Sequence, residues 1–556
     1  MDMIRRFLFL ILILWACLAS GQQTVGLFTN NWLAVNGYTL WSNSRITYLI
    51  DNCGYVVNTW TSDYPTNTAV YLLENGNLLR TAEISGNFNV GGASGRLELF
   101  NWDGDLVWSY NYAGDDFHLH HDIEPLPNGH ILLIAWERKS MEAAIAAGRA
   151  PDRVAGGGLW PEKIVEIEMV GTNQINTVWE WHLWDHLIQD ADPAKANYGD
   201  ISAHPELVDL NAPNEVTGST NVDWVHLNAI DYNPVLDQIA VSSRHLHEVW
   251  IIDHSTTTAE AAGHSGGNSG KGGDLLYRWG NPAVYHRGTT GDQTLYGPHN
   301  VTWILEEAHP QYGKLMVFNN GLGRPGGNFS SVDIWTPPVA ESGVYNLEPN
   351  QRFGPDTVDW AYTAPGFYSA NISGAQALAE GNILICSGKQ GHFFEITGSR
   401  QIVWDYINPV SGNSPVKQGQ TPYQNDTFRA TRYREDYPAF TGRDLTPGDP
   451  VELSPWPYSC TLYPGGPVGT GRDPKALEGV SLAGNPFGDQ LQIENMTGQS
   501  LQMAIFDATG RLVYPETTID NLTAVDTADW PAGLYIVRVF NRARDRAFIQ
   551  KAIKIN

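Results

Sequence analysis

The sequence predicts an all-β protein, in which a six-bladed β-propeller is followed by a small C-terminal β-sandwich. The first observation is a repeat, because six apolar strands end in a tryptophan beside another aromatic or a small residue. Self-similarity of this kind indicates a repeat architecture. The second is composition: 56 glycines and 20 tryptophans in 556 residues, with no long stretch of helical periodicity. Such a composition favours many short strands joined by turns.

The first residues have the order of an export signal. Arginines at 5 and 6 precede an apolar run over 7–16, and small residues follow at 19–21. We therefore expect residues 1–21 to be a cleaved signal peptide. The apolar run is short for a bilayer span, so no stable transmembrane segment is expected after cleavage. A lipid anchor at Cys17 is an alternative, although the tryptophan two residues before it fits that motif poorly.

Cysteine count and charge restrict the remaining possibilities. Cys53, Cys386 and Cys460 remain after cleavage, and an odd number allows at most one internal disulfide. The formal net charge of -26 argues against a nucleic-acid or anionic-membrane surface, because phosphate binding requires clustered Lys and Arg. Any anionic substrate must therefore be held by a local positive pocket.

The tryptophan strands give the blade pattern. Each closes a hairpin, as in 97–108, and a second hairpin with an Asn-Gly or similar turn lies between, as in 126–133. Two hairpins make a four-stranded blade, and six blades that close radially leave no long exposed edge. We assign residues 25–463 to this propeller. The N-terminal strands that end at Trp60 should pair with the last strand, 428–433, and so close the ring.

The repeats are unevenly spaced, so large loops are inserted between strands. Residues 141–149 have the pattern of a short helix, and the glycine-rich segment 263–273 is expected to be flexible. The insertions 141–220 and 255–298 are expected to form a substrate-binding rim.

Histidines recur at one position of the repeat. In blade order, the residues at the entry to the innermost strand are Thr68, His121, His226, His299, Asn371 and Arg429. These positions line the central channel of a propeller. A single histidine is more often structural, but three at one repeat position favour a functional site. Three imidazoles would thus converge beside an amide and a guanidinium.

Two arginines are expected at the same rim. Arg244 follows the strand after His226, and Arg324 follows the strand after His299. Arginine offers forked donors and remains charged, which suits a tetrahedral oxyanion. Histidine can attack such a centre or transfer a proton near neutral pH. The pattern therefore predicts a site for an oxyanion group.

The segment 226–234, with Ser242–Ser243–Arg244, His299 and Phe318–Gly321 with Arg324, resembles the bacterial aryl-sulfate sulfotransferase family over about residues 25–460. The resemblance implies a six-bladed propeller that moves a sulfuryl group from a phenolic sulfate to a phenol through a sulfated histidine. Neither a nucleotide sulfate donor nor a cofactor is implied.

By this resemblance His226, His299 and Arg324 match active-site positions of the family, and we add His121 as a catalytic candidate. The family nucleophile lies in a later blade, where this chain has Asn371, and the nearest histidine is His392. The candidate substrate-binding residues are Asn371, Arg244, His392, Asn228 and Arg429.

Two other functions are consistent with the same residues. The first is a non-catalytic surface propeller that binds a glycan or another anion. The second is a metal-dependent hydrolase or lyase, with His121, His226 and His299 as ligands, because three neutral imidazoles suit zinc or copper. We expect sulfuryl transfer without a metal.

The C-terminal part is separable. Residues 464–476 are rich in glycine and proline near their start, as in a linker, and 477–556 alternate apolar and polar residues, which predicts a small β-sandwich. Segments 485–487, 506–511, 531–535 and 551–555 resemble the C-terminal sorting domain of type IX secretion. This resemblance implies a secreted or surface-attached protein whose partner is that secretion machinery. A carbohydrate-binding sandwich is the alternative.

Overall fold

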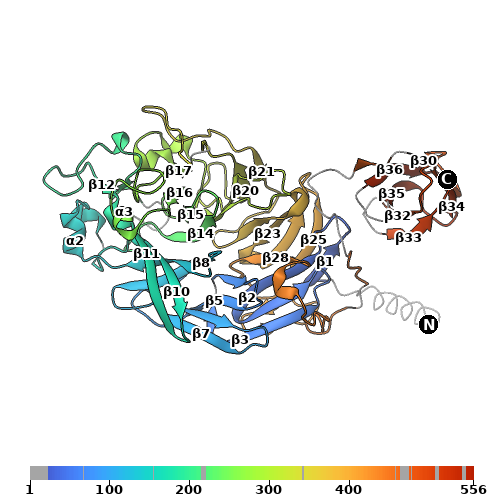
Figure 1. Ribbon diagram of the computed structural model, residues 1–556, viewed down its shortest axis with the longest axis horizontal. Helices are drawn as coiled ribbons and strands as arrows, with labels where there is room; N and C mark the ends of the chain where they lie inside the picture. Colours follow the sequence, from blue (N-terminus) through green and yellow to red (C-terminus); the bar gives the residue numbers. More distant parts are fainter. Residues whose placement is uncertain are drawn as a thin grey trace, which may run out of the picture.

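The computed structural model describes residues 23–556 except 67, 155, 214–220, 341–342, 457–458, 464–474, 478, 508–511, 541–545 and 556. The expected signal peptide and most of the expected linker lie outside these described residues. The described chain is all-β and is built mainly from antiparallel sheets (Figure 1). Within the described residues, no helix has the length and apolar character that a membrane crossing requires.

Among the described residues between Gly26 and Arg434, six sheets have three or more strands. Four of them follow chain order: β4 (Val70–Leu72), β5 (Leu78–Glu83), β6 (Gly95–Phe100) and β7 (Leu106–Asn111); β8 (Phe117–Pro125), β9 (Ile131–Glu137), β10 (Glu162–Val170) and β11 (Gln174–His182); β14 (Leu227–Asn233), β15 (Gln238–Ser243), β16 (Glu248–Asp253) and β17 (Tyr277–Trp279); β18 (His299–Trp303), β19 (Leu315–Asn319), β20 (Ser331–Trp335) and β21 (Trp360–Tyr362).

The other two sheets contain the N-terminal strands. One has β22 (Gly374–Ala377), β23 (Ile383–Ser387), β24 (His392–Ile396) and β25 (Ile402–Ile407), with β1 (Gly26–Asn30) at its edge; the other has β28 (Ala430–Arg434), β2 (Gly37–Asp51) and β3 (Val56–Thr66). Short elements lie in the connections: α2 (Met141–Ala146), α3 (Thr258–Ala261), β12 (Leu187–Ile188) with β13 (Val208–Asp209), and β26 (Val410–Ser411) with β27 (Ser414–Pro415).

The repeated tryptophans connect each sheet to the next. On the outer strands, the indole N–H groups donate across the boundary: Trp60 to Asn101 O, Trp108 to Gln174 O, Trp179 to Thr256 Oγ1, Trp279 to Pro355 O and Trp404 to Asn52 O. Trp360 instead receives the Arg400 guanidinium over its ring. In five of the six positions, the ring buries apolar area and its N–H finds an acceptor across the boundary, which explains why the sequence repeats this residue.

Neighbouring sheets also contact one another, in most cases through their first strands. β8 contacts β14, β14 contacts β18, β18 contacts β22 and β22 contacts β28, while β2 contacts β4 and β5 contacts β8. These contacts connect each sheet to the next and lead back to the sheet that contains β2 and β28. The entries of the first strands are therefore brought near one another.

The predicted pairing of the chain ends is confirmed. β2 pairs with β28 in antiparallel register, from Gly37 opposite Arg434 to Trp41 opposite Ala430. In Figure 1 the blue N-terminal strands accordingly lie beside the orange strands. The buried Arg432 adds bonds to Val35 O at 2.6 Å and Thr39 Oγ1 at 2.7 Å. A disulfide joins Cys53 to Cys460, and Cys386 is a buried free thiol.

Two local expectations have different outcomes. The short helix predicted within 141–149 is confirmed as α2. The segment 263–273 is not the flexible loop that its glycines suggested. It folds back on itself through bonds from Gly272 N to Gly266 O and from Gly273 N to Gly263 O, and Ser269 N donates to the Asp253 carboxylate.

The C-terminal residues form two sheets over a common core. The five-stranded sheet contains β29 (Lys475–Ala476), β36 (Arg546–Lys554), β35 (Gly533–Phe540), β32 (Leu501–Asp507) and β33 (Leu512–Ile519), and the three-stranded sheet contains β30 (Val480–Ala483), β31 (Gln490–Asn495) and β34 (Leu522–Asp526). Leu491, Ile493, Ile505 and Val537 lie buried in their common core. These strands form the red body in Figure 1.

The disulfide generates a stability prediction. Replacing Cys460 with serine should lower the free energy of unfolding by about 2–5 kcal/mol, because the unfolded chain is then released from a cross-link between distant residues. Urea unfolding of Cys460→Ser against the unchanged protein, both lacking residues 1–22, measures this.

A thiol count gives the control. The unfolded, unreduced protein without residues 1–22 should react at one thiol, Cys386, and the reduced protein at all three cysteines. Three reactive thiols before reduction would contradict the pairing.

Candidate active site

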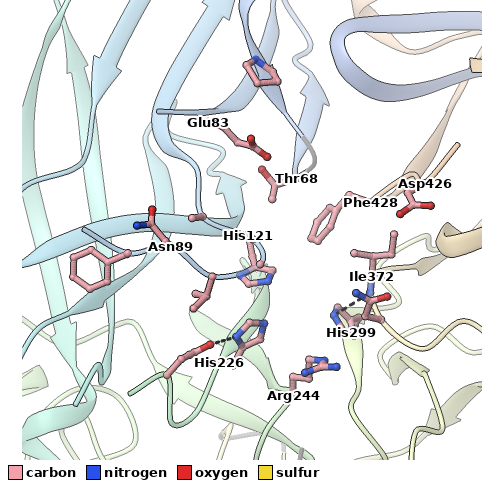
Figure 2. A pocket seen from close by; sticks show the side chains of 18 of the residues that line it. Thr68, Glu83, Asn89, His121, His226, Arg244, His299, Ile372, Asp426 and Phe428 are labelled. Carbon is pink, nitrogen blue, oxygen red and sulfur yellow. Dashed lines mark hydrogen bonds and ion pairs between the residues drawn. The ribbon is translucent and has the colours of Figure 1, made fainter. Parts of the chain in front are cut away.

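A cavity of about 1070 Å³ lies where the first strands of the sheets begin. Its walls include five of the six predicted strand-entry residues, which are Thr68, His121, His226, His299 and Asn371, together with Arg244. Figure 2 shows His121, His226, Arg244 and His299 pointing towards one common space. The structure therefore brings together three of the predicted catalytic residues and two of the predicted substrate-binding residues.

The backbone at these entries has an unusual conformation. His121 has φ 52° and His226 has φ 55°, while Asn300 has 52° and Ile372 has 49°. Side chains disfavour this left-handed region, a β-branched one most of all, and such residues cluster at functional sites. By this criterion His299 and Asn371 lie one residue earlier than His121 and His226, so the repeat alignment of the sequence is offset by one there.

His226 is held by a carboxylate. Its Nδ1 lies 2.5 Å from Asp223 Oδ2, and the other Asp223 oxygen accepts from the Trp136 indole at 3.2 Å. His245 stacks on the His226 ring at 4.6 Å between centroids. An Nδ1–H donated to Asp223 leaves the Nε2 lone pair, which has no hydrogen-bond partner among the described residues. The ring is therefore oriented as a nucleophile or a base.

His121 stands at the end of a buried chain of three groups. Its Nδ1 lies 2.9 Å from Nδ1 of His120, whose Nε2 lies 2.8 Å from Glu162 Oε2. Burial raises the pKa of Glu162 well above its usual range and lowers the pKa of His120 to about 3. A protonated Glu162 donates to His120, which donates in turn to His121. Nε2–H of His121 is then a proton donor in the cavity wall.

His299 has both ring nitrogens engaged. The Asn320 amide donates to Ser369 O at 2.8 Å and to Ile372 O at 2.9 Å, so its oxygen faces His299 Nδ1 at 2.7 Å. His299 Nδ1 must therefore donate, and Nε2 accepts from Ile372 N at 3.2 Å. This network fixes the ring.

The three cavity histidines are uncharged at neutral pH. Burial lowers the pKa of His121, His226 and His299 well below the usual value, and the Arg244 charge adds to the effect on each. Unprotonated imidazoles retain a lone pair, as nucleophilic attack requires.

Arg244 supplies a positive charge beside these rings. Its Nη1 lies 3.2 Å from His245 Nε2, it makes no ion pair with a described residue, and its buried Nε lacks a hydrogen-bond partner among them. An unpaired guanidinium in a partly buried wall is costly unless an anion completes its hydrogen bonds. The cavity is thus suited to an oxyanion next to His226.

The structure places four predicted site residues away from the cavity wall. Arg324 donates to Ser331 Oγ at 3.0 Å and lies over the Phe329 ring, and Arg429 pairs with Asp122 at 2.7 Å. His392 bonds Asp405 at 2.7 Å across β24 and β25, and Asn228 is buried between Ser242 and Pro298 O. Each of these side chains bonds a neighbour in the protein, although the buried Nε atoms of Arg324 and Arg429 have no hydrogen-bond partner among the described residues.

Sequence reasoning did not select the residues that orient the histidines. Asp223 and His120 stand close to predicted residues in the chain and could have been included on that ground. Asn320 and His245 follow neighbouring strands, where only pairing in the sheet shows what they face. Glu162 lies in β10, and no local pattern connects it with His120.

Three side chains at the cavity, Asp223, His226 and His245, lie close enough together to bind one metal ion. One ligand atom each from Asp223, His226 and His245 lie within 4.8 Å of one another. This set shares one member with the metal ligands considered from the sequence, His121, His226 and His299.

Comparisons with known proteins follow the two parts of the chain. The family model described as arylsulfotransferase (ASST) matches residues 19–434, and the secretion system C-terminal sorting domain matches residues 484–555. No curated protein sequence matches the chain significantly.

Solved structures resemble the chain only weakly. A protein of unknown function from Bacteroides caccae is 13% identical with a TM-score of 0.39, covering 72% of this chain and 100% of that one. A virginiamycin B lyase from Staphylococcus aureus is 11% identical with a TM-score of 0.32, covering 69% and 89%. A putative 6-phosphogluconolactonase from Bacteroides fragilis is 10% identical with a TM-score of 0.34, covering 72% and 98%. At these scores the similarities carry no conclusion about function.

The buried histidines generate a pH prediction. Burial lowers the pKa of His245 to about 3, against about 6.5 in an unfolded chain. The unfolded chain therefore binds more protons below about pH 6.5, so this contribution to stability is complete above that pH and is lost as the pH falls towards 3. In His245→Gln, the slope of unfolding free energy against pH between pH 5 and 6 should decrease by about 1 kcal/mol per pH unit. Urea unfolding at each pH measures it, and equal slopes would contradict the burial of a neutral His245.

Proposed function

This chain belongs to the arylsulfotransferase family, and we propose that it transfers a sulfuryl group from a phenolic sulfate to a phenol, carried on His226 Nε2. The observation that carries this proposal is the placement of a neutral imidazole, held through Nδ1 by Asp223, beside the unpaired Arg244. The His226 imidazole would be an activated nucleophile, and Arg244 would bind the oxyanion that this imidazole attacks.

In the first half-reaction, the His226 Nε2 lone pair attacks the sulfur of the donor sulfate ester. The N–S bond forms, the S–O bond to the phenol breaks, and the bonding electrons leave on the phenolate. The Nδ1 proton remains between the ring and Asp223, which stabilises the positive charge of the sulfated imidazole. Arg244 donates to the sulfuryl oxygens, where donors aimed at developing charge typically contribute about 2.7–4 kcal/mol.

His121 supplies the proton for the leaving phenolate. Its ring centroid lies 4.5 Å from that of His226, and the chain from Glu162 through His120 replaces the proton that it gives away. In the second half-reaction the acceptor phenol returns a proton to His121, its oxygen attacks sulfur, and the N–S bond breaks. The proton that His121 received from His120 then passes back to Glu162, so donor and acceptor have exchanged one sulfuryl group and the protonation state of the protein is restored.

The cavity has the size and lining for aromatic substrates. Its volume of about 1070 Å³ exceeds what one phenol needs, and Phe88 and Phe428 in its walls offer rings for stacking. Its cations include Arg244 and Lys389, and Lys389 is already paired with Asp426. A nucleotide sulfate donor would bring further phosphate charges, so this lining supports a simple phenolic donor.

We also propose that the six sheets between Gly26 and Arg434 are the blades of one closed propeller. The contacts between successive first strands, the indole bonds between sheets and the pairing of β2 with β28 support this arrangement. The two C-terminal sheets over one core likewise support a sandwich.

The sorting domain over 484–555 directs the protein to secretion or to attachment at the outer-membrane surface. Its partner is then the type IX secretion machinery. The transferase would meet its phenolic substrates outside the cell.

A second candidate function is metal-dependent hydrolysis, which the Asp223, His226 and His245 group supports. Such a site would activate water on zinc and release the phenol without an acceptor. In that case turnover depends on the metal and not on added phenol.

The transfer of sulfate from 4-nitrophenyl sulfate to phenol tests the proposal. His226→Gln should abolish it, Asp223→Asn should lower kcat by about 10²-fold or more because the ring loses its orientation, and Arg244→Gln by about 10²–10³-fold. Nitrophenolate release measures all three. Lys314→Gln, which changes an outer ion pair with Asp359, is the matched control and should retain full activity.

Trapping identifies the carrier. Rapid quench with donor alone should leave one SO3 group on the peptide that contains His226. A label on another histidine, or full activity of His226→Gln, would refute the assignment. Acceptor-independent release that a chelator stops would establish the metal-dependent alternative.

A further inference from the structure

We propose that His186, His264 and Asp274 form a structural binding site for a zinc-class divalent cation, remote from the cavity, which fixes the glycine-rich segment 263–273. None of the three residues lines the cavity. The site does not depend on the proposed transfer reaction.

The ligand atoms converge from three separate segments. His186 Nδ1 and His264 Nδ1 each lie 2.8 Å from Asp274 Oδ1, and the ligand atoms of all three residues lie within 4.8 Å of one another. His186 follows the short 3-10 turn Leu183–Asp185. His264 is the second residue of the glycine-rich segment, and Asp274 directly follows that segment. Two imidazole nitrogens and one carboxylate oxygen are a donor set that zinc accepts.

The surroundings orient His186 as a metal ligand. Its second nitrogen, Nε2, lies 2.8 Å from Ala261 O, and ligating histidines characteristically donate their other N–H to such an acceptor. The Trp181 ring stacks on His186 at an interplanar angle of 4°, and its indole N–H donates to Gly273 O at 2.7 Å. A Cβ on Gly273 would lie 2.6 Å from His186 Nε2, so glycine is required for this approach.

The hydrogen-bond partners available to these three residues favour a bound cation. Without a metal, Asp274 Oδ1 would have to satisfy the buried His186 Nδ1 directly, while His186 Nε2 faces Ala261 O. His264 would in addition have to share the same carboxylate oxygen. A bound cation instead takes the lone pairs of both Nδ1 atoms and the carboxylate oxygen, and Nε2–H of His186 keeps its bond to Ala261. Each polar atom then has a partner.

The bound ion would explain the order of this segment. Eleven residues rich in glycine have a large conformational entropy to lose, yet they are folded against α3 and Asp253. A cation that bridges His264 and Asp274 to His186 closes the segment at both ends. The His264 side chain is 63% exposed, which leaves a coordination position for water and an entry path.

Zinc loading tests the inference. The protein is stripped with chelator, incubated with zinc chloride, dialysed and analysed by elemental mass spectrometry. One zinc per chain should remain in the unchanged protein and none at this site in His264→Asn, whose exposed position should not disturb folding. His204→Asn, at another exposed histidine paired with a carboxylate, is the matched control and should retain the ion.

Two further measurements assign the ion. Zinc should raise Tm and slow amide exchange over 263–273 in the unchanged protein and in Asp223→Asn, but not in His264→Asn. If zinc is retained by His264→Asn and lost by Asp223→Asn, the ion belongs to the cavity and the inference is wrong. Absence of bound zinc from the unchanged protein overturns it as well.

Discussion

The pairing of β2 with β28 is the constraint on which the rest of the structure depends. It joins a strand that begins at Gly37 to one that ends at Arg434, so one sheet holds together segments that lie almost 400 residues apart in the sequence. Without that sheet, β4 and β22 would each lose a neighbour, and the first strands would no longer surround one cavity. Loop closure over such a separation costs entropy, which the Arg432 bonds and the Cys53–Cys460 disulfide offset.

Burial gives the cavity its chemistry. An exposed imidazole titrates near neutrality, whereas His121, His226 and His299 remain uncharged because the walls exclude water. Each ring is then distinguished by its partner: a carboxylate at His226, another imidazole at His121 and an amide at His299. Three chemically identical side chains thus differ in which ring nitrogen keeps a free lone pair or N–H, and the proposed reaction assigns them different roles on that ground.

The fold was largely predictable because its pattern is local and repeated. Tryptophan strands and hairpin turns can be recognised in the sequence itself. The pairing of the N-terminal strands with the last strand of the repeats could be predicted in the same way. The candidate site was predictable only in part. Histidines at repeat positions were found, but only the folded structure shows that Arg244 lines the cavity and that Arg324 instead reaches Ser331. Glu162 lies in β10, which β9 separates from the strand that carries His120. The order of 263–273 comes from contacts that composition does not encode.

The covalent bond between Cys53 and Cys460 has a consequence for a protein exposed to proteases outside the cell. A cut in a surface connection between Cys53 and the start of β28 leaves fragments that are still joined through sulfur. Both fragments also remain paired through β2 and β28. A single nick would therefore convert the domain into a two-chain molecule without releasing either chain, and the cavity walls would stay in place.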